Sequence, residues 1–148
     1  MNESKFRLWL IFSILWIIVI YIFSIFSGDV SNTQSHAVWE VLHTIWPDLA
    51  HSTVRNIAHC LEYAILGWFS LGMFFHTKSF KLSKPLLFCL LVALGDETLQ
   101  LYINGRASEV LDVWLDFLGA FISCLIFWGI FSLVNKDSTA TNTAATKK

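Results

Sequence analysis

Residues 8–26 read LWLIFSILWIIVIYIFSIF and contain no charged side chain. A transmembrane α-helix needs about 20 consecutive apolar residues, so this stretch is long enough to cross a bilayer. Lys5 and Arg7 precede it, as basic residues do in a secretory signal peptide. However, the stretch exceeds a signal core of roughly 7–15 residues, and no clear small-residue cleavage site follows. We therefore expect an uncleaved membrane anchor.

The composition of the whole chain agrees with a membrane protein. Hydrophobic residues make up 55% of the 148 residues and charged residues only 14%, against about 25% charged in a soluble domain. Further apolar stretches at residues 57–75, 86–102 and 113–134 predict three more membrane spans. The expected fold class is an all-α membrane protein with one four-helix domain over residues 1–134. A Thr- and Ala-rich tail, 135–148, is expected to be disordered and cytoplasmic.

The polar segment between the first two spans, residues 27–55, has an amphipathic pattern. Its apolar residues recur at helical spacing, at Val38, Leu42, Ile45 and Leu49. Trp39 and Trp46 are typical of a membrane interface. We predict an outer interfacial helix here, between the first and second spans; a connecting helix packed on the bundle is the alternative. The segment also contains three histidines that could bind a metal, although their spacing matches no familiar site: His36, His43 and His51.

Basic residues are unevenly distributed between the two sides of such a four-span chain. With the N-terminus inside, the inner side holds Lys5, Arg7, Lys78, Lys81, Lys84, Lys136, Lys147 and Lys148. The outer side holds only Arg55 and Arg106. Because cytoplasmic loops carry an excess of Lys and Arg, both termini are expected to be cytoplasmic. No basic stripe exists along the chain, which argues against a nucleic-acid partner.

Ionisable residues of the second span gather on one helix face near the outer side. Arg55, His59 and Glu62 are four and three residues apart, so their side chains share that face. A charge at the centre of a membrane helix costs about 2.5–3.5 kcal/mol on insertion scales. Such side chains are therefore expected to face the bundle interior or a wet cavity.

The third and fourth spans bring further polar residues to the same depth. Asp96 and Gln100 share a face of the third span, beside Glu97, and Asp112 and Asp116 share a face of the fourth. The short connection between these two spans contains Arg106. The first span has no ionisable group and is expected to be a packing wall. Together these positions predict a polar pocket in the outer leaflet, open to the outside.

Structural roles are the alternative for several of these residues. Glu62 with Arg55 or Arg106 could be an ion pair that fixes helix register, and His59 could be a packing histidine. Three glycines are expected to be close-packing points between helices: Gly67, Gly119 and Gly129.

Three motifs in order resemble those of a known family. Residues 55–67, RNIAHCLEYAILG, resemble the R-K-x-x-H-x-x-E-Y-x-x-L-G signature of VanZ-like proteins. Residues 96–119 resemble the D-E-x-x-Q…G-R…D-x-x-x-[ND]-x-x-G pattern of the same family. The matching polar positions are Arg55, His59, Glu62, Tyr63, Asp96, Glu97, Gln100, Arg106, Asp112 and Asp116. The resemblance covers residues 8–134 and implies a multi-pass protein of a bacterial-type cell membrane, from a family named for resistance to the lipoglycopeptide teicoplanin.

Two departures from the family pattern make the predicted pocket more acidic. Asn56 replaces a usual Lys, and Asp116 stands where many members have Asn. The ligand of this chain could therefore differ from that of the founding member.

The favoured function is binding of an amphiphile, either an envelope-lipid head group or a lipid-tailed antibiotic, with Arg55 and Arg106 contacting its anionic groups. One alternative is an enzyme acting on an envelope lipid phosphate, with His59 and Glu62 as acid and base. A divalent metal would then be held by Asp96, Glu97, Asp112 and Asp116. No nucleophile elbow or metalloprotease motif is present, so catalysis is the less favoured hypothesis and no cofactor is expected outside it. A small dimeric exporter is a third hypothesis, and homo-oligomers are compatible with the sequence.

Overall fold

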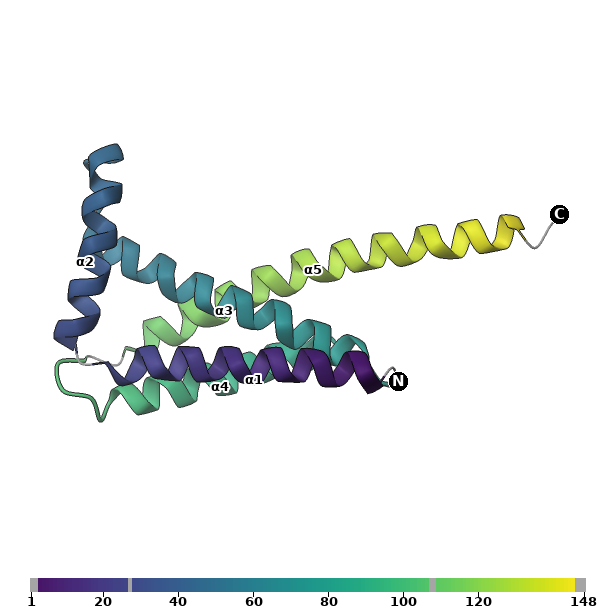
Figure 1. The fold of residues 1–148 in the computed structure, drawn as a ribbon, viewed down its shortest axis with the longest axis horizontal. Helices are drawn as coiled ribbons and strands as arrows, with labels where there is room; N and C mark the ends of the chain where they lie inside the picture. The colour runs from purple at the N-terminus through teal and green to yellow at the C-terminus, as the bar shows by residue number, and fades with distance from the viewer. Residues whose placement is uncertain (1–2, 27, 107–108, 146–148) are drawn as a thin grey trace.

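The computed structural model describes residues 3–26, 28–106 and 109–145, and every regular element within these ranges is an α-helix (Figure 1). The helices are α1 (Glu3–Ile25), α2 (Gly28–Ile45), α3 (His51–Phe75), α4 (Ser83–Gln100) and α5 (Val110–Ala145). The all-α class expected from the sequence is therefore confirmed.

The helix α3 lies at the centre of the bundle. It contacts each of the other four helices, while α4 also packs against α1 and α5. Four helices run along the bundle, and α2 crosses their direction at one end (Figure 1). We call this the α2 end; α1 and α4 end there, and α3 and α5 begin there. Fully buried residues at the meeting of α3, α4 and α5 form the core, among them Tyr63, Leu66, Ala93 and Ala120.

Two glycines allow α3 and α5 to touch backbone to backbone. A Cβ atom at Gly119 would overlap the carbonyl of Cys60, and one at Gly67 would lie 2.7 Å from the carbonyl oxygen of Ala120. Small residues permit this close approach between helices. Gly129 differs, because a Cβ atom there would meet nothing within 4 Å. The expected close packing is thus found at two of the three glycines and is wrong for Gly129.

Three of the helices are long and apolar enough to cross a membrane. These are Glu3–Ile25, His51–Phe75 and the Val110–Ile130 part of α5, with mean hydropathies of 2.7, 1.3 and 2.0. Among the described residues α4 does not meet the same criterion, since its 18 residues include Lys84, Asp96 and Glu97. Asp96 and Glu97 are buried inside the bundle, so neither acid lies on the outer face of α4.

Large apolar side chains cover the outside of the bundle. The helix α1 exposes Leu8, Ile11, Leu15, Ile18 and Ile22 by about half of their surface, from 49 to 54%. Soluble monomers rarely expose apolar patches of this extent, whereas a surface in lipid is apolar. This surface and the three apolar helices define a membrane-type helical protein.

Most element boundaries differ from those of the predicted spans. The helix α1 starts at Glu3 rather than at residue 8, and α3 starts at His51 rather than at residue 57. The helix α4 ends at Gln100 rather than at residue 102. Finally, α5 continues to Ala145 through most of the tail that was predicted to be disordered. No Gly or Pro follows Gly129 in the sequence to end the helix.

Candidate functional site

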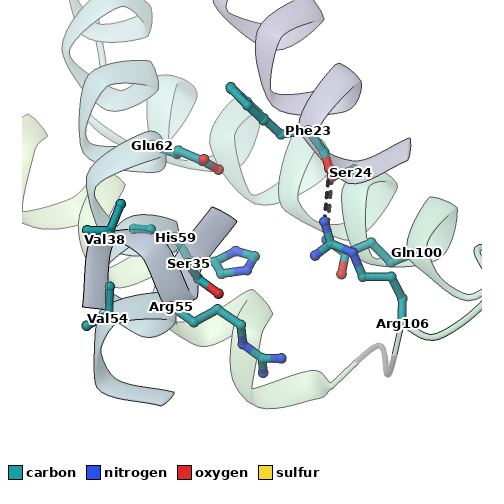
Figure 2. Close-up of a pocket in the computed structure, with 11 residues that line it drawn as sticks. Phe23, Ser24, Ser35, Val38, Val54, Arg55, His59, Glu62, Gln100 and Arg106 are labelled. Atoms are coloured by element: carbon teal, nitrogen blue, oxygen red, sulfur yellow. Dashed lines mark hydrogen bonds between the residues drawn. The ribbon is translucent and has the colours of Figure 1, made fainter. Parts of the chain in front are cut away.

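A cavity of about 210 Å³ lies at the α2 end, between the last turns of α1 and α4, the first turns of α3, the helix α2 and the connection after α4 (Figure 2). It is lined by Phe23, Ser24, Ser35, Val38, Val54, Arg55, Ala58, His59, Glu62, Gln100 and Arg106. Polar side chains therefore enter the cavity from α1, α2, α3, α4 and the connection.

One face of α3 supplies three ionisable groups to this cavity. Figure 2 shows Arg55, His59 and Glu62 pointing from α3 toward Gln100 and Arg106 on the opposite wall. The spacing of four and three residues therefore places these three side chains on one wall, as the helix period predicts.

Two arginines from different elements face the cavity. The Arg55 Nη2 atom lies 3.5 Å from the Asp112 Oδ2 atom of α5. Arg106 donates from Nε to the Phe26 carbonyl, at 3.3 Å, and from Nη2 to the Phe23 carbonyl, at 2.9 Å. These carbonyls belong to the end of α1, where a helix has carbonyls without partners of its own. Arg106 thus caps α1 as well as lining the cavity.

The turn before Arg106 depends on a glycine. Gly105 has a φ of 76°, in the left-handed region that L-residues with a side chain rarely adopt. The Arg106 N–H then donates to the Ile103 carbonyl at 3.2 Å, which closes the turn and directs Arg106 back over the bundle. Partial burial lowers the pKa of the Arg106 guanidinium from its ordinary value, and the carboxylate of Asp96 opposes this shift. An arginine remains charged under such conditions.

On the side away from the cavity, His59 lies beside the buried carboxylate of Asp116. Its Nδ1 atom lies 3.3 Å from the Asp116 Oδ1 atom, without the alignment of a hydrogen bond. The Asp116 side chain is completely buried, and that of His59 is 11% exposed. The pair connects the cavity wall on α3 with the interior face of α5.

Asp96 is the centre of a hydrogen-bonded group on α4 and α1. It accepts a short hydrogen bond from Ser24 and one of 3.3 Å from the Gln100 side chain, whose Nε2 also lies 3.4 Å from the Ser24 hydroxyl. The neighbouring Glu97 accepts a hydrogen bond of 3.2 Å from the backbone N–H of Glu109. Both acids are buried, at 1% and 4% exposure.

The ten residues singled out in the sequence form two layers at the α2 end. Five of them line the cavity: Arg55, His59, Glu62, Gln100 and Arg106. The other five do not line it and are buried: Tyr63, Asp96, Glu97, Asp112 and Asp116. The second layer contacts the first through the pairs of Asp112 with Arg55 and of Asp116 with His59.

The first span contributes to the site in a way that was not predicted from the sequence. The helix α1 is more than a packing wall, because Ser24 donates to Asp96 and lines the cavity. In addition, Trp16 Nε1 donates to the Glu62 carbonyl at 2.8 Å. One feature of the sequence could have indicated this role. Ser13 and Ser24 are the serines of the apolar stretch, and their separation of 11 residues is about three helical turns. Both therefore lie on one face of the helix.

The histidines in and just after α2, His36, His43 and His51, pack around the ring of Trp39. The Trp39 and His43 rings stack at 4.4 Å, and the His36 and His51 rings lie 5.7 Å apart. The His51 Nε2 atom is 2.9 Å from the Ser35 hydroxyl. Among the described residues, no group of three ligand side chains close enough for one metal ion includes these histidines. Their contacts attach α2 to the start of α3.

An all-helical bundle with an apolar exterior and a polar cavity at one end defines a membrane-type protein with a buried ionic site. A family model described as VanZ/LLP1 matches residues 9–133, and the chain belongs to this family. The resemblance found in the three motifs is thereby confirmed. No curated protein and no solved structure matches the chain.

Proposed function

We propose that this VanZ/LLP1 protein binds the anionic head group of a membrane amphiphile in the cavity at the α2 end. The observation that carries the proposal is the convergence of Arg55 and Arg106, from two separate elements, on one cavity. Guanidinium groups bind phosphate and carboxylate through paired, charge-assisted hydrogen bonds. Ser35 and His59 add polar atoms to the same walls, while Phe23, Val38 and Val54 supply an apolar side.

The size of the cavity limits what can enter it. The cavity has a volume of about 210 Å³. Sites for drug-sized ligands are larger, about 300–1,000 Å³. The cavity therefore suits a phosphate or a small head group whose tail remains in the bilayer. Only a part of a teicoplanin molecule would fit into the cavity. A role in lipoglycopeptide resistance is therefore a narrower proposal than binding of a head group.

The proposed setting is a bacterial-type cell membrane crossed four times, with α4 as the additional span and both termini in the cytoplasm. Support for α4 comes from Leu87, Leu91 and Leu94, which form an exposed stripe at helical spacing, 47 to 59% exposed. The acids of α4 lie on its interior side. The helix α2 would lie at the outer interface, because it crosses the bundle and exposes Val41 and Ile45, and the exposed Trp46 follows it directly.

Catalysis at a lipid phosphate is a second candidate function, favoured by one observation. The pair of His59 with Asp116 places an imidazole on the cavity wall with a carboxylate behind it, as in general acid–base sites. Glu62 lies one turn away on the same wall. In this hypothesis His59 and Glu62 would exchange protons with a bound phosphate ester and water.

Thermal unfolding of the purified full chain in detergent tests head-group binding. Dihexanoyl phosphatidic acid, dihexanoyl glycerol and teicoplanin would be compared as additives. A ligand at 100 times its Kd stabilises the folded state by about 2.7 kcal/mol, so a rise in Tm of about 5 °C is expected with the phosphate-bearing lipid and not with the diacylglycerol. A rise with teicoplanin alone would instead favour the resistance role.

Matched arginine variants connect such a shift to the cavity. Arg55→Gln removes a charge, and Arg106→Lys keeps the charge but removes the planar fork of donors. Both are expected to abolish most of the shift, whereas Arg7→Gln, an exposed arginine at the opposite end of α1, keeps it. Equal shifts with phosphatidic acid and diacylglycerol, or an unchanged shift in both cavity variants, would contradict head-group binding.

A further inference from the structure

Three buried carboxylates meet at the α2 end, on α4 and α5. One oxygen atom each of Asp96, Glu97 and Asp116 lies within 4.8 Å of the other two. The residues are 1%, 4% and 0% exposed. Acids on a surface can approach one another because water screens them, but buried charges are normally paired or coordinate a metal. A carboxylate in such a place is stabilised by a compensating charge, or it takes up a proton and becomes neutral.

The basic side chains that line the cavity do not balance the acids beside them. Among the cavity-lining and buried side chains, the carboxyl groups are Glu62, Asp96, Glu97, Asp112 and Asp116, and the basic groups are Arg55, His59 and Arg106. With all five carboxyl groups ionised and His59 protonated, two negative charges are in excess. Arg55 is paired with Asp112, and Arg106 directs its hydrogen bonds to backbone carbonyls of α1. A single divalent cation would restore neutrality.

The side chain of Tyr63 is a separate indication of a bound group. Tyr63 is completely buried, and its hydroxyl has no hydrogen-bond partner among the described residues. Tyr63 packs in one core cluster with Ala93 of α4 and Ala120 of α5, the two helices that carry the three carboxylates. Both Asp116 oxygens also accept no hydrogen bond from a described residue. Leaving a buried polar group unsatisfied costs about 1–3 kcal/mol, which a cation and its bound water would relieve.

We propose that Asp96, Glu97 and Asp116 bind one divalent cation that prefers oxygen ligands: Mg²⁺, Mn²⁺ or Ca²⁺. Oxygens that share one such ion lie at most about 4–5 Å apart, twice the metal–oxygen distance of about 2.0–2.6 Å. The three carboxylates, within 4.8 Å of one another, meet this limit for Ca²⁺, and a smaller ion would draw them slightly closer together. The group contains no His nitrogen or Cys sulfur, which a Zn²⁺ site would favour.

Such a cation would join α4 to α5 beside the cavity. Asp96 is already connected to two cavity-lining residues, Ser24 and Gln100, so the cation would act on the cavity through them. It would also add positive charge behind the two arginines, which favours an anionic head group. The metal site itself does not require that ligand, because its three carboxylates come from the protein alone.

Binding of Mn²⁺ to the purified full chain tests the site directly. After treatment with EDTA and removal of the chelator, Mn²⁺ is titrated into protein in detergent, and the EPR signal of free aqueous Mn²⁺ is recorded. We expect saturable binding of about one ion per chain, displaced by excess Mg²⁺ or Ca²⁺. Absence of saturable binding to the folded wild-type protein would overturn the proposal without reference to any variant.

Amide variants, which have nearly the same shape as the carboxylates that they replace, test where the ion binds. Glu97→Gln and Asp116→Asn are expected to weaken Mn²⁺ binding at least about tenfold, because each removes a charged ligand. Asp112→Asn is the control: it changes a buried acid one turn earlier on α5, outside the group of three. Circular dichroism checks that each variant is folded. Equal loss in Asp112→Asn, or unchanged affinity in both ligand variants, would overturn the assignment.

The Mn²⁺ titration and the lipid-dependent Tm measurement test the two proposals separately. Mn²⁺ binding that depends on Glu97, with no lipid-dependent shift in Tm, would support the metal site and contradict the head-group function. A lipid-dependent shift that requires Arg55, without Mn²⁺ binding, would do the reverse.

Discussion

His59 on α3 and Asp116 on α5 lie 3.3 Å apart, on the same pair of helices whose backbones touch between Cys60 and Gly119. The neighbouring contact leaves little freedom for the pair to separate. Because His59 lines the cavity and Asp116 is completely buried, the arrangement places a basic group on the cavity wall and its acidic partner behind the wall. The backbone contact between Cys60 and Gly119 therefore holds α3 against α5 and also fixes the position of the His59–Asp116 pair.

The His59–Asp116 pair is expected to contribute to stability as a unit. His59→Gln and Asp116→Asn should each lower Tm, because breaking a buried ion pair costs about 3–5 kcal/mol. The double variant should lose less than the sum of the two single effects, with a coupling of about 0.5–3 kcal/mol. Thermal unfolding in the presence of a chelator measures this cycle free of any metal. His76→Gln, at the far end of α3, is the control and should add to Asp116→Asn without coupling.

The glycine contact makes a second prediction about the same interface. Gly119→Ala should destabilise the protein by about 1–3 kcal/mol, because the added Cβ overlaps the Cys60 carbonyl and forces α3 and α5 apart. Gly129→Ala has open space and should be neutral or stabilising by up to about 1 kcal/mol through helix propensity. Tm values of both proteins check this difference, and similar values for the two variants would contradict the α3–α5 contact.

The gathering of polar side chains at the α2 end could be predicted from the sequence. Spacings of three and four residues set a helix face, and the cost of exposing charge to lipid directs that face inward. Arg55, His59 and Glu62 accordingly line one wall. Such spacing does not say how deep a side chain lies, which depends on the distance to the neighbouring helix. The burial of Asp96 and Asp116 behind the cavity could not be predicted for that reason.

Other features escaped prediction because they depend on contacts between helices. Ser24 carries no charge, so a search for ionisable residues passes over it, although it donates to Asp96. A mean hydropathy likewise cannot tell an acid that faces the bundle from one that faces lipid, which is why α4 fails the criterion for a span. The continuation of α5 to Ala145 reflects the absence of a stop residue rather than an apolar pattern.

Ser24 gives a third prediction, with a control on the same helix. Ser24→Ala removes the hydroxyl that donates to the buried Asp96, and hydrogen bonds to charged groups are worth about 1.5–3 kcal/mol. A fall in Tm of about 3–10 °C is expected for a chain of this size. Ser13→Ala should change Tm little, since within the described ranges the Ser13 hydroxyl bonds to the Trp9 carbonyl of its own helix, at 2.9 Å, and to no other helix. Equal effects would show that the Asp96 bond contributes nothing.

The last prediction concerns the membrane crossing by α4. Tyr102 follows α4 and is 81% exposed, and Lys81 precedes it on the surface. If α4 crosses the membrane with the α2 end outside, Tyr102→Cys should react with a membrane-impermeant maleimide on intact cells, whereas Lys81→Cys should react only after lysis. The parent protein gives the background from its own cysteines, of which Cys89 and Cys124 are buried. Labelling of both variants on intact cells would place both ends of α4 outside and leave three crossings; labelling of Lys81→Cys alone would reverse the orientation and put the cavity in the cytoplasm.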